Sequence, residues 1–158
     1  MTEFTHLTET GEIHMVDVTD KQPTVRSATA TGFVHCSEKV ISALRDQSVP
    51  KVDVFALARV AGIQGAKKTA DLLPLAHVIG VHGATVDLEL TDAGVAIEAT
   101  VRTADRTGVE MEAITAVSVA ALTIVDMVKG IDKHTWISDI KIQSKTGGKS
   151  GDWKREAK

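Results

Sequence analysis

The longest apolar stretch of the chain lies between Gly108 and Gly130. No charged residue occurs from Ala113 to Val125, so this stretch predicts a helix that begins near one glycine and ends near the other. At 100° per residue its polar side chains fall in one arc of about 140°. These residues are Glu112, Thr115, Ser118, Thr123, Asp126 and Lys129. The helix is therefore expected to be buried over most of its circumference.

The remaining hydrophobic pattern predicts a mixture of strands and helices. Alternating or β-branched segments predict strands at residues 24–36, 78–90, 95–103 and 136–144, the middle two forming a hairpin around Asp92–Gly94. Apolar residues at helical spacing predict a short helix capped by Ser37 and a longer one from Asp53 to the residue before Pro74. The order β-α-α-β-β-α-β favours one α+β domain, with an antiparallel sheet covered on one face by helices.

Both ends of the chain differ from this pattern. Residues 1–23 are polar and broken except at His14–Val18, which predicts a mobile arm that docks by one short segment. The tail from residue 145 to 158 is glycine-rich and basic. It is either a flexible, solvated end or a loop that embraces phosphate, with Lys145 and Lys149 supplying the charge. It lacks the spacing of a Walker motif.

The composition is that of an ordinary soluble globular protein, with 43% hydrophobic and 25% charged residues. The net charge of −3 and the few aromatic residues give no reason to expect binding to nucleic acid. No signal peptide is recognised, and no stretch is judged to approach the ~18 apolar residues of a membrane span. The single Cys36 excludes an intrachain disulfide and suits the cytoplasm, and the scattered histidines predict no metal site.

Several charged residues have two interpretations. Asp126 and Lys129 could close the last helical turn as an ion pair or act on a substrate. Glu112 and Asp126 are separated by about 21 Å along the helix, so one small ligand cannot readily touch both in the same copy. If both ends are functional, an oligomer is expected. Lys51 precedes the N-cap Asp53 by two residues, where a phosphate could receive the lysine and the helix amides together.

Six motifs resemble one known family along nearly the whole chain. They are HMVDV at 14–18, KVDVFALARVAGIQGAKKT at 51–69, LPLAH at 73–77, TGVEMEAIT at 107–115, ALTIVDMVK at 121–129 and GGKSGD at 147–152. The chain is similar to the molybdenum cofactor biosynthesis protein C (MoaC) family, the cyclic pyranopterin monophosphate synthases. This resemblance implies a ferredoxin-like fold, a hexamer built from three dimers, and an active site at the dimer interface.

The resemblance also implies a lyase reaction and the residues that carry it. The substrate would be 3',8-cyclo-7,8-dihydroguanosine 5'-triphosphate, derived from GTP, and the products cyclic pyranopterin monophosphate and pyrophosphate. The implied catalytic residues are Asp126, Lys51 and Lys129. The implied substrate contacts are Leu75, Ala76, His77, Met111 and Glu112, with Glu110, Lys67, Arg26 and Asp17 as further contacts. The sequence requires no cofactor and leaves open whether Mg²⁺ accompanies the triphosphate.

The chain departs from the family pattern at three positions. The family usually has Leu-Cys-His-Pro where this chain has Leu75, Ala76, His77 and Val78, and a glycine where it has Val52. Because the implied catalytic set is intact, these changes affect the expected rate and substrate fit more than the identity. The alternative is a catalytically silent relative that binds a nucleotide or pterin as a regulatory or assembly partner.

Overall fold

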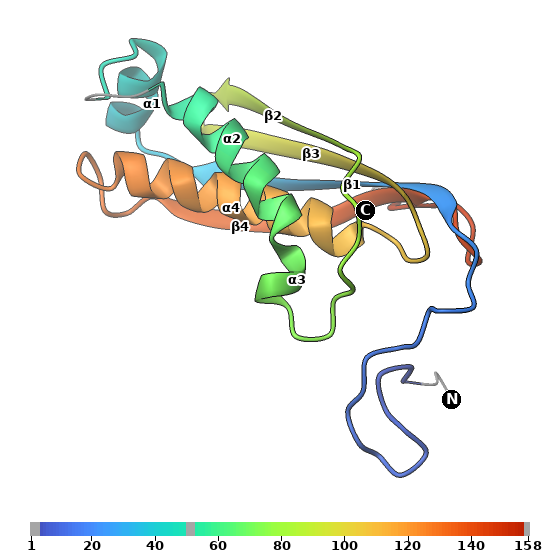
Figure 1. The fold of residues 1–158 in the computed structure, drawn as a ribbon. Coiled ribbons are helices and arrows are strands. Elements are labelled where there is room, and N and C mark those ends of the chain that lie inside the picture. Colours follow the sequence, from blue (N-terminus) through green and yellow to red (C-terminus); the bar gives the residue numbers. More distant parts are fainter. Residues whose placement is uncertain (1–3, 50–52, 157–158) are drawn as a thin grey trace.

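The structure is a computed structural model that describes residues 4–49 and 53–156. Its centre is a five-stranded antiparallel sheet in the order β2-β3-β1-β4-β5 (Figure 1). The strands are β1 (Thr24–His35), β2 (Gly83–Thr91), β3 (Gly94–Asp105), β4 (Trp136–Thr146) and β5 (Trp153–Lys154). The helices are α1 (Glu38–Arg45), α2 (Val54–Lys67), α3 (Thr69–Leu72) and α4 (Glu110–Val128).

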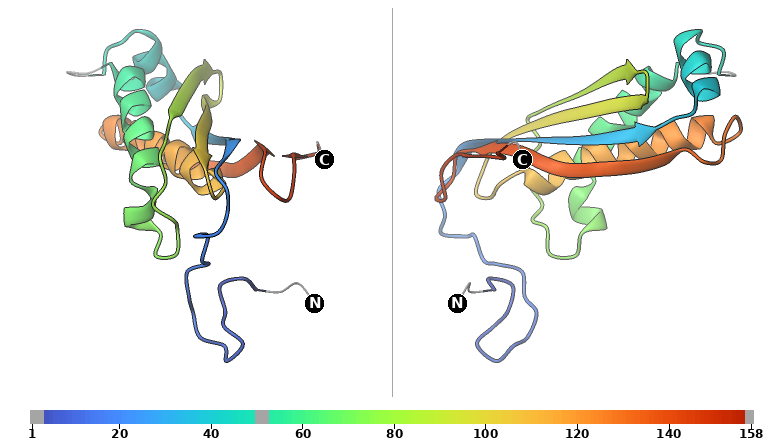
Figure 2. Two further views of the ribbon diagram at one scale, coloured as in Figure 1. Left: turned by 45° about the vertical axis from the view of Figure 1, so that its right-hand side comes forward. Right: turned by 180° about the vertical axis from the view of Figure 1, so that it is seen from behind.

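Helices α2, α3 and α4 lie on one side of the sheet (Figures 1 and 2). The core forms between α4 and the central strands, where small side chains such as Ala30, Ala99 and Ala116 are fully buried. Helix α2 crosses α4 closely, because Gly62 has no side chain to hold the Ala116 carbonyl away. The predicted α+β fold with helices on one face of an antiparallel sheet is therefore confirmed.

The connections have the ferredoxin-like arrangement. β1 and β2 are joined through helices with β3 between them, and β3 and β4 are joined through α4 with β1 between them. This is the split β-α-β pattern used twice. Asp53 caps α2 as predicted, since its Oδ1 accepts from the Ala56 amide at 3.0 Å. Ser37 occupies the N-cap position of α1, but its hydroxyl makes no capping bond.

The second predicted helix is interrupted before Pro74, which corrects the prediction of one continuous helix. It breaks at Lys68, whose amide donates to the Gly65 carbonyl at 3.0 Å. The Thr69 hydroxyl donates to the Ala66 carbonyl at 3.0 Å. These short-range bonds close the last turn of α2, and α3 follows as a separate turn.

The predicted hairpin begins at Gly83 and not at Val78, which is a second correction. Residues 78–82 lie beside the end of β3, where the His82 amide donates to the Arg102 carbonyl at 3.0 Å and the bonds of Gly80 are made by side chains. Thr103 donates from its hydroxyl to the Gly80 carbonyl at 2.6 Å, and Asp105 accepts from the Gly80 amide at 3.2 Å. Side-chain bonds of this kind replace strand pairing, so alternation in the sequence overestimated the strand.

The two ends of the chain lie near the same end of the molecule. Residues 4–18 extend away from the sheet in all three views, with the segment around Leu7 and Ile13 folded back on itself (Figure 2). The tail turns back after β4, and β5 pairs Trp153 with Lys145. The sequence left the tail as a flexible end or a phosphate loop, and the structure describes it as a hairpin up to residue 156.

Helix α4 also corrects the judgement that no segment approaches a membrane span. By length and composition alone its 19 residues could cross a membrane. Its side chains Ala113, Val117 and Ile124 are nevertheless completely buried against the rest of the chain. The core helix of a soluble protein passes the same test, so this finding is weak evidence for a membrane helix.

Candidate active site

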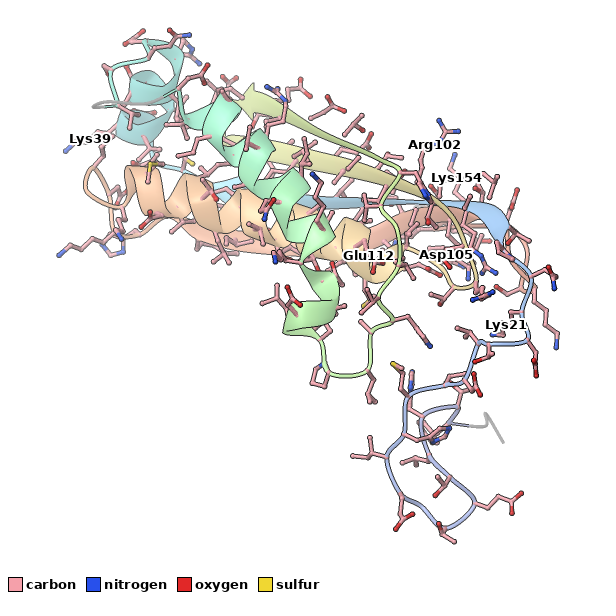
Figure 3. All side chains as sticks on the ribbon, in the orientation of Figure 1. Lys21, Lys39, Arg102, Asp105, Glu112 and Lys154 are labelled. Carbon is pink, nitrogen blue, oxygen red and sulfur yellow. The ribbon has the colours of Figure 1, made fainter. Side chains whose placement is uncertain are left out.

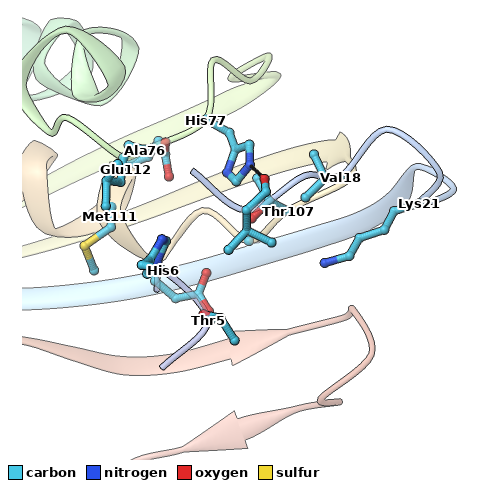
Figure 4. A pocket seen from close by; sticks show the side chains of 13 residues that line it. Thr5, His6, Val18, Lys21, Ala76, His77, Thr107, Met111 and Glu112 are labelled. Carbon is cyan, nitrogen blue, oxygen red and sulfur yellow. Dashed lines mark hydrogen bonds between the residues drawn. The ribbon is translucent and has the colours of Figure 1, made fainter. Parts of the chain in front are cut away.

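A pocket of about 440 Å³ opens where the N-terminal arm meets the start of α4 (Figure 4). Its walls come from four segments that are distant in sequence: the arm, the loop after α3, the loop after β3, and the first turn of α4. We call it the Glu112 pocket. It is lined by Thr5, His6, Val16, Val18, Lys21, Leu75, Ala76, His77, Thr107, Gly108, Glu110, Met111 and Glu112.

Glu112 is the most unusual group in this pocket. Glu112 is only 4% exposed, because it lies on the first turn of a helix that is otherwise packed into the core. Burial raises the pKa of the carboxyl from 4.5 to about 7, and the neighbouring Glu110 carboxylate acts in the same direction. A backbone hydrogen bond and His77 oppose the shift in pKa. Glu112 can therefore hold or release a proton near neutral pH.

His77 links the pocket to the arm. Its Nε2 lies 2.6 Å from the Val16 carbonyl oxygen. A carbonyl can only accept, so Nε2 is assigned as the donor and carries the hydrogen. In the neutral ring Nδ1 is then an acceptor that is available to a ligand. Val78, which follows His77, is 92% exposed, while His77 itself is half-buried.

Lys145 brings the tail hairpin to the same region. Its Nζ lies 3.0 Å from Glu110 Oε1 and 2.9 Å from Ser150 Oγ. Both members of the ion pair are about three-quarters buried, at 28% and 27% side-chain exposure. The turn that returns the chain depends on Gly147, which has a φ of +80°, and on its amide donating to Asp152 Oδ1 at 3.0 Å. The cation is thereby held beside Glu110, which lines the pocket, although Lys145 itself is not part of the lining.

Arg26 supports the loop that leads into the pocket. Its guanidinium donates to the Asp105 carbonyl at 3.1 Å and to the Arg106 carbonyl at 3.2 Å. Arg106 in turn donates to the Lys21 carbonyl at 2.9 Å, which ties the arm to this loop. Arg26 therefore acts here on the backbone, and it does not line the Glu112 pocket.

Asp126 and Lys129 lie at the opposite end of α4. They form an ion pair with an Nζ–Oδ1 distance of 2.5 Å, and their side chains are 56% and 63% exposed. This is the ion-pair interpretation left open by the sequence. Fourteen residues separate Asp126 from Glu112, which is about 21 Å of helix. Within one chain the two implied parts of the site are therefore not brought together.

Three further predicted site residues, Asp17, Lys67 and Lys149, do not line the pocket. Asp17 lies between two lining residues, but its carboxylate accepts from the amide and hydroxyl of Thr19, and these bonds lower its pKa. Lys67 is exposed in the last turn of α2, and Lys149 is exposed in the tail turn. Lys51 and its neighbour Val52 lie outside the described residues.

Sequence reasoning missed part of the pocket wall. It identified the segments 75–77 and 110–112, but not Thr5, His6, Lys21, Thr107 or Gly108. The available signal was the short segment at residues 14–18, whose docking was predicted but whose target was not. Among the described residues no group of three or more His, Cys, Asp or Glu side chains could hold a metal ion.

Comparisons with known proteins agree on one family. A model described as the MoaC family matches residues 15–148. The cyclic pyranopterin monophosphate synthase of Nocardioides sp. (strain ATCC BAA-499 / JS614) is 58% identical, with 96% of this chain and 95% of that protein covered. The synthase of Streptomyces coelicolor is 57% identical, with 96% and 89% covered. The synthase of Corynebacterium glutamicum (strain ATCC 13032) is 54% identical, with 97% and 98% covered.

Proposed function

The chain belongs to the MoaC family, and we propose that it is a cyclic pyranopterin monophosphate synthase, an enzyme of molybdenum cofactor biosynthesis. The proposed substrate is 3',8-cyclo-7,8-dihydroguanosine 5'-triphosphate, and pyrophosphate leaves as the pterin forms, which makes the enzyme a lyase. High identity over nearly the full length of several synthases supports this proposal. A cytoplasmic location is expected for such a biosynthetic step.

The observation that carries the proposed chemistry is the buried carboxyl of Glu112. Opening and rebuilding a purine ring requires several proton transfers. A carboxyl with a pKa of about 7 exchanges protons at physiological pH without a large free-energy penalty in either direction. His77, whose Nε2 is bonded to the Val16 carbonyl, supplies Nδ1 as a second hydrogen-bonding group in the same pocket. Leu75, Ala76 and Met111 provide apolar surface for the flat ring system.

Cations around the same pocket suit a triphosphate. Lys145 is held behind the lining residue Glu110 by its bonds to Glu110 and Ser150, and Lys21 lines the pocket from the arm. Compact ammonium groups bind phosphate oxygens as point charges. We propose that Lys145 turns from Glu110 to the phosphates when substrate binds, and that any Mg²⁺ arrives with the triphosphate.

The catalytic residues implied at the far end of α4 require a second copy of the chain. Asp126 and Lys129 cannot reach a ligand in the Glu112 pocket of their own chain, because about 21 Å of helix separates Asp126 from Glu112 and Lys129 lies still further away. We propose that the exposed end of α4 in one copy completes the pocket of another, together with Lys51. A homo-oligomer, expected to be a hexamer of three dimers, is then part of the active site.

A direct turnover assay tests this function. The purified full-length chain is incubated with the cyclised dihydro-GTP, and pterin product and pyrophosphate are measured. Glu112→Gln and Asp126→Asn should each lower kcat by about 100-fold or more, since each removes a proposed proton-transfer group. Tight binding of the nucleotide by the wild-type chain without product would favour the silent relative over the enzyme.

A further inference from the structure

Gly80 lies shortly after His77, in the loop that leads from the Glu112 pocket to β2. Two side chains of β3 hold its backbone. The Asp105 carboxylate accepts from the Gly80 amide at 3.2 Å, and the Thr103 hydroxyl donates to the Gly80 carbonyl at 2.6 Å. Side chains two positions apart leave the same face of a strand, so Thr103 and Asp105 act together. We call this pair the Gly80 clamp.

Both members of the Gly80 clamp are fixed in the state that binds the loop. Thr103 is only 2% exposed, so its hydroxyl is shielded from bulk water. The second oxygen of Asp105 accepts from the Arg106 amide at 2.8 Å. The bonds from the Arg106 and Gly80 amides lower the pKa of the Asp105 carboxyl, so it stays ionised near neutral pH and accepts from both.

His82 holds the same loop at a second point. Its Nδ1 accepts from the Ala104 amide at 3.0 Å, and its own amide donates to the Arg102 carbonyl at 3.0 Å. A Cβ on Gly80 would lie 3.1 Å from His82 Nε2, so the ring lies close to the Gly80 backbone. The loop is therefore fixed to the end of β3 at residues 80 and 82.

The end of β3 leads directly into another wall of the Glu112 pocket. Thr107 and Gly108 line the pocket just after β3, while His77 lines it from the clamped loop. Figure 3 shows Asp105 at the same end of the molecule as Glu112 and Lys21. The Gly80 clamp therefore sets the spacing of two pocket walls that come from different segments.

Hydrogen bonds continue around the pocket as a closed ring. Arg106 donates to the Lys21 carbonyl at 2.9 Å, and His77 Nε2 donates to the Val16 carbonyl at 2.6 Å. The N-terminal arm is thereby tied to both walls. The Gly80 clamp connects the same two walls without the arm, so its loss opens the ring beside His77.

We infer that Thr103 and Asp105 are positioning residues for the reaction, which hold the His77 loop against the start of α4 through the backbone of Gly80. Neither residue lines the pocket, so both act through His77 and its neighbours. Displacement of a reacting group by about 1 Å can cost about 100-fold in rate. The kinetic part of this inference rests on the proposed function, whereas the hold on His77 is measurable without turnover.

Substitutions of Thr103 test the kinetic part in the full-length chain. Thr103→Val keeps the branched shape and removes the hydroxyl, and it should lower kcat/KM by about tenfold or more, mainly through kcat, because His77 is no longer held in place. Thr103→Ser keeps the hydroxyl and should restore kcat/KM. Thr91→Val is the matched control, since the Thr91 hydroxyl donates to the Gly94 carbonyl at 3.0 Å at the opposite end of β3.

Nuclear magnetic resonance tests the hold on His77 directly. The ¹⁵N shifts of the His77 ring, assigned by their loss in His77→Gln, report whether Nε2 still donates to Val16. Asp105→Ala removes both bonds that the carboxylate accepts, so it should change these shifts as Thr103→Val does. Thr103→Ser and Thr91→Val should leave them as in the wild-type chain.

The outcomes separate positioning from a folding defect. Circular dichroism and thermal unfolding should show that all variants are folded. A Thr103→Val variant with wild-type kcat/KM and unchanged ring shifts would overturn the inference, as would a Thr91→Val variant that is equally impaired. If the wild-type chain shows no turnover but the ring shifts change in Thr103→Val, the Gly80 clamp stands and the proposed function fails.

Discussion

Glu112 shows how one buried residue can couple the fold to proton chemistry. Glu112 lies in the first turn of α4 and is only 4% exposed. Because water is excluded from the carboxyl, its charged form is disfavoured. Its ordinary pKa of 4.5 becomes about 7 in the folded chain. The group therefore favours the protonated state at the pH where most carboxyls in proteins are charged.

This shift predicts a pH-dependent stability. The folded-state pKa lies above the unfolded value, so the folded chain binds more protons between about pH 4.5 and 7. The free energy of unfolding should then fall by up to about 3 kcal/mol as the pH rises through that window, and level off above it. Glu112→Gln should remove this fall. Urea unfolding at a series of pH values measures it.

The control for this prediction is Glu38→Gln, which changes an exposed carboxyl in the first turn of α1. It should leave the pH dependence of the wild-type chain intact. A Glu112→Gln variant whose stability still falls over the same window would show that Glu112 does not carry the raised pKa.

Lys145 is a second single residue with a testable role, since its ammonium group is proposed to hold the triphosphate. Lys145→Gln should raise KM by about tenfold or more with a much smaller change in kcat, since it removes binding and not a proton-transfer group. Steady-state kinetics with the cyclised nucleotide measure both constants. Lys141→Gln, on the same strand and paired with Asp139, should leave both near wild type. A fall in kcat alone would contradict the proposed role.

At the scale of elements, the tail hairpin determines whether Lys145 reaches the pocket. Gly147 has a φ of +80°, and a Cβ there would lie 2.3 Å from the Val25 carbonyl oxygen. Gly147→Ala should therefore push the turn away from β1 and lower stability by about 1–3 kcal/mol. Thermal unfolding measures the loss, and KM should rise as Lys145 moves.

Gly151→Ala separates the two causes of that loss. Gly151 also has a positive φ, of +69°, but a Cβ there would meet nothing within 4 Å. Its replacement should cost only the backbone term, about 1 kcal/mol. Equal losses at both positions would mean that the contact with Val25 does not matter.

The elements were largely predictable because their patterns are local. The strand at 24–35, the helix capped by Asp53 and the long apolar helix each follow from periodicity and capping. The break at Lys68 and the late start of β2 could not be predicted in this way. Both depend on side chains that bond to the backbone only in the folded chain, such as the hydroxyls of Thr69 and Thr103. Local patterns do not report such tertiary hydrogen bonds.

The pocket was less predictable than the fold for a similar reason. Residues 75–77 and 110–112 came from the family resemblance, while the arm contributes its wall through contacts such as Val16 with His77. The arm has little periodic signal, so its position depends on hydrogen bonds across about sixty residues of chain, as with His77 and Val16. Sequence patterning cannot rank such long-range contacts.

At the scale of the whole molecule, the two ends of α4 predict complementation between inactive variants. Glu112→Gln damages the pocket of its own copy, and Asp126→Asn damages the helix end proposed to serve a neighbour. Mixed assemblies of the two would contain some sites with both parts intact. After unfolding and refolding together at equal amounts, a shared dimeric site should recover about a quarter of wild-type activity.

Each variant refolded alone is the control and should stay inactive. If the mixture is no more active than the two separate variants, then each chain works with its own residues and the shared site is wrong.

The stacking of Trp136 on His35, with ring centroids 3.8 Å apart and planes at 6°, gives the protein a built-in optical probe. The chain has no tyrosine, and its other tryptophan, Trp153, lies beneath the Arg155 guanidinium on β5. With Trp153 replaced by phenylalanine, the emission would come from Trp136 alone. Unfolding separates the indole from the imidazole, so the emission should change as the chain unfolds, and stability could be followed in a cuvette without any label.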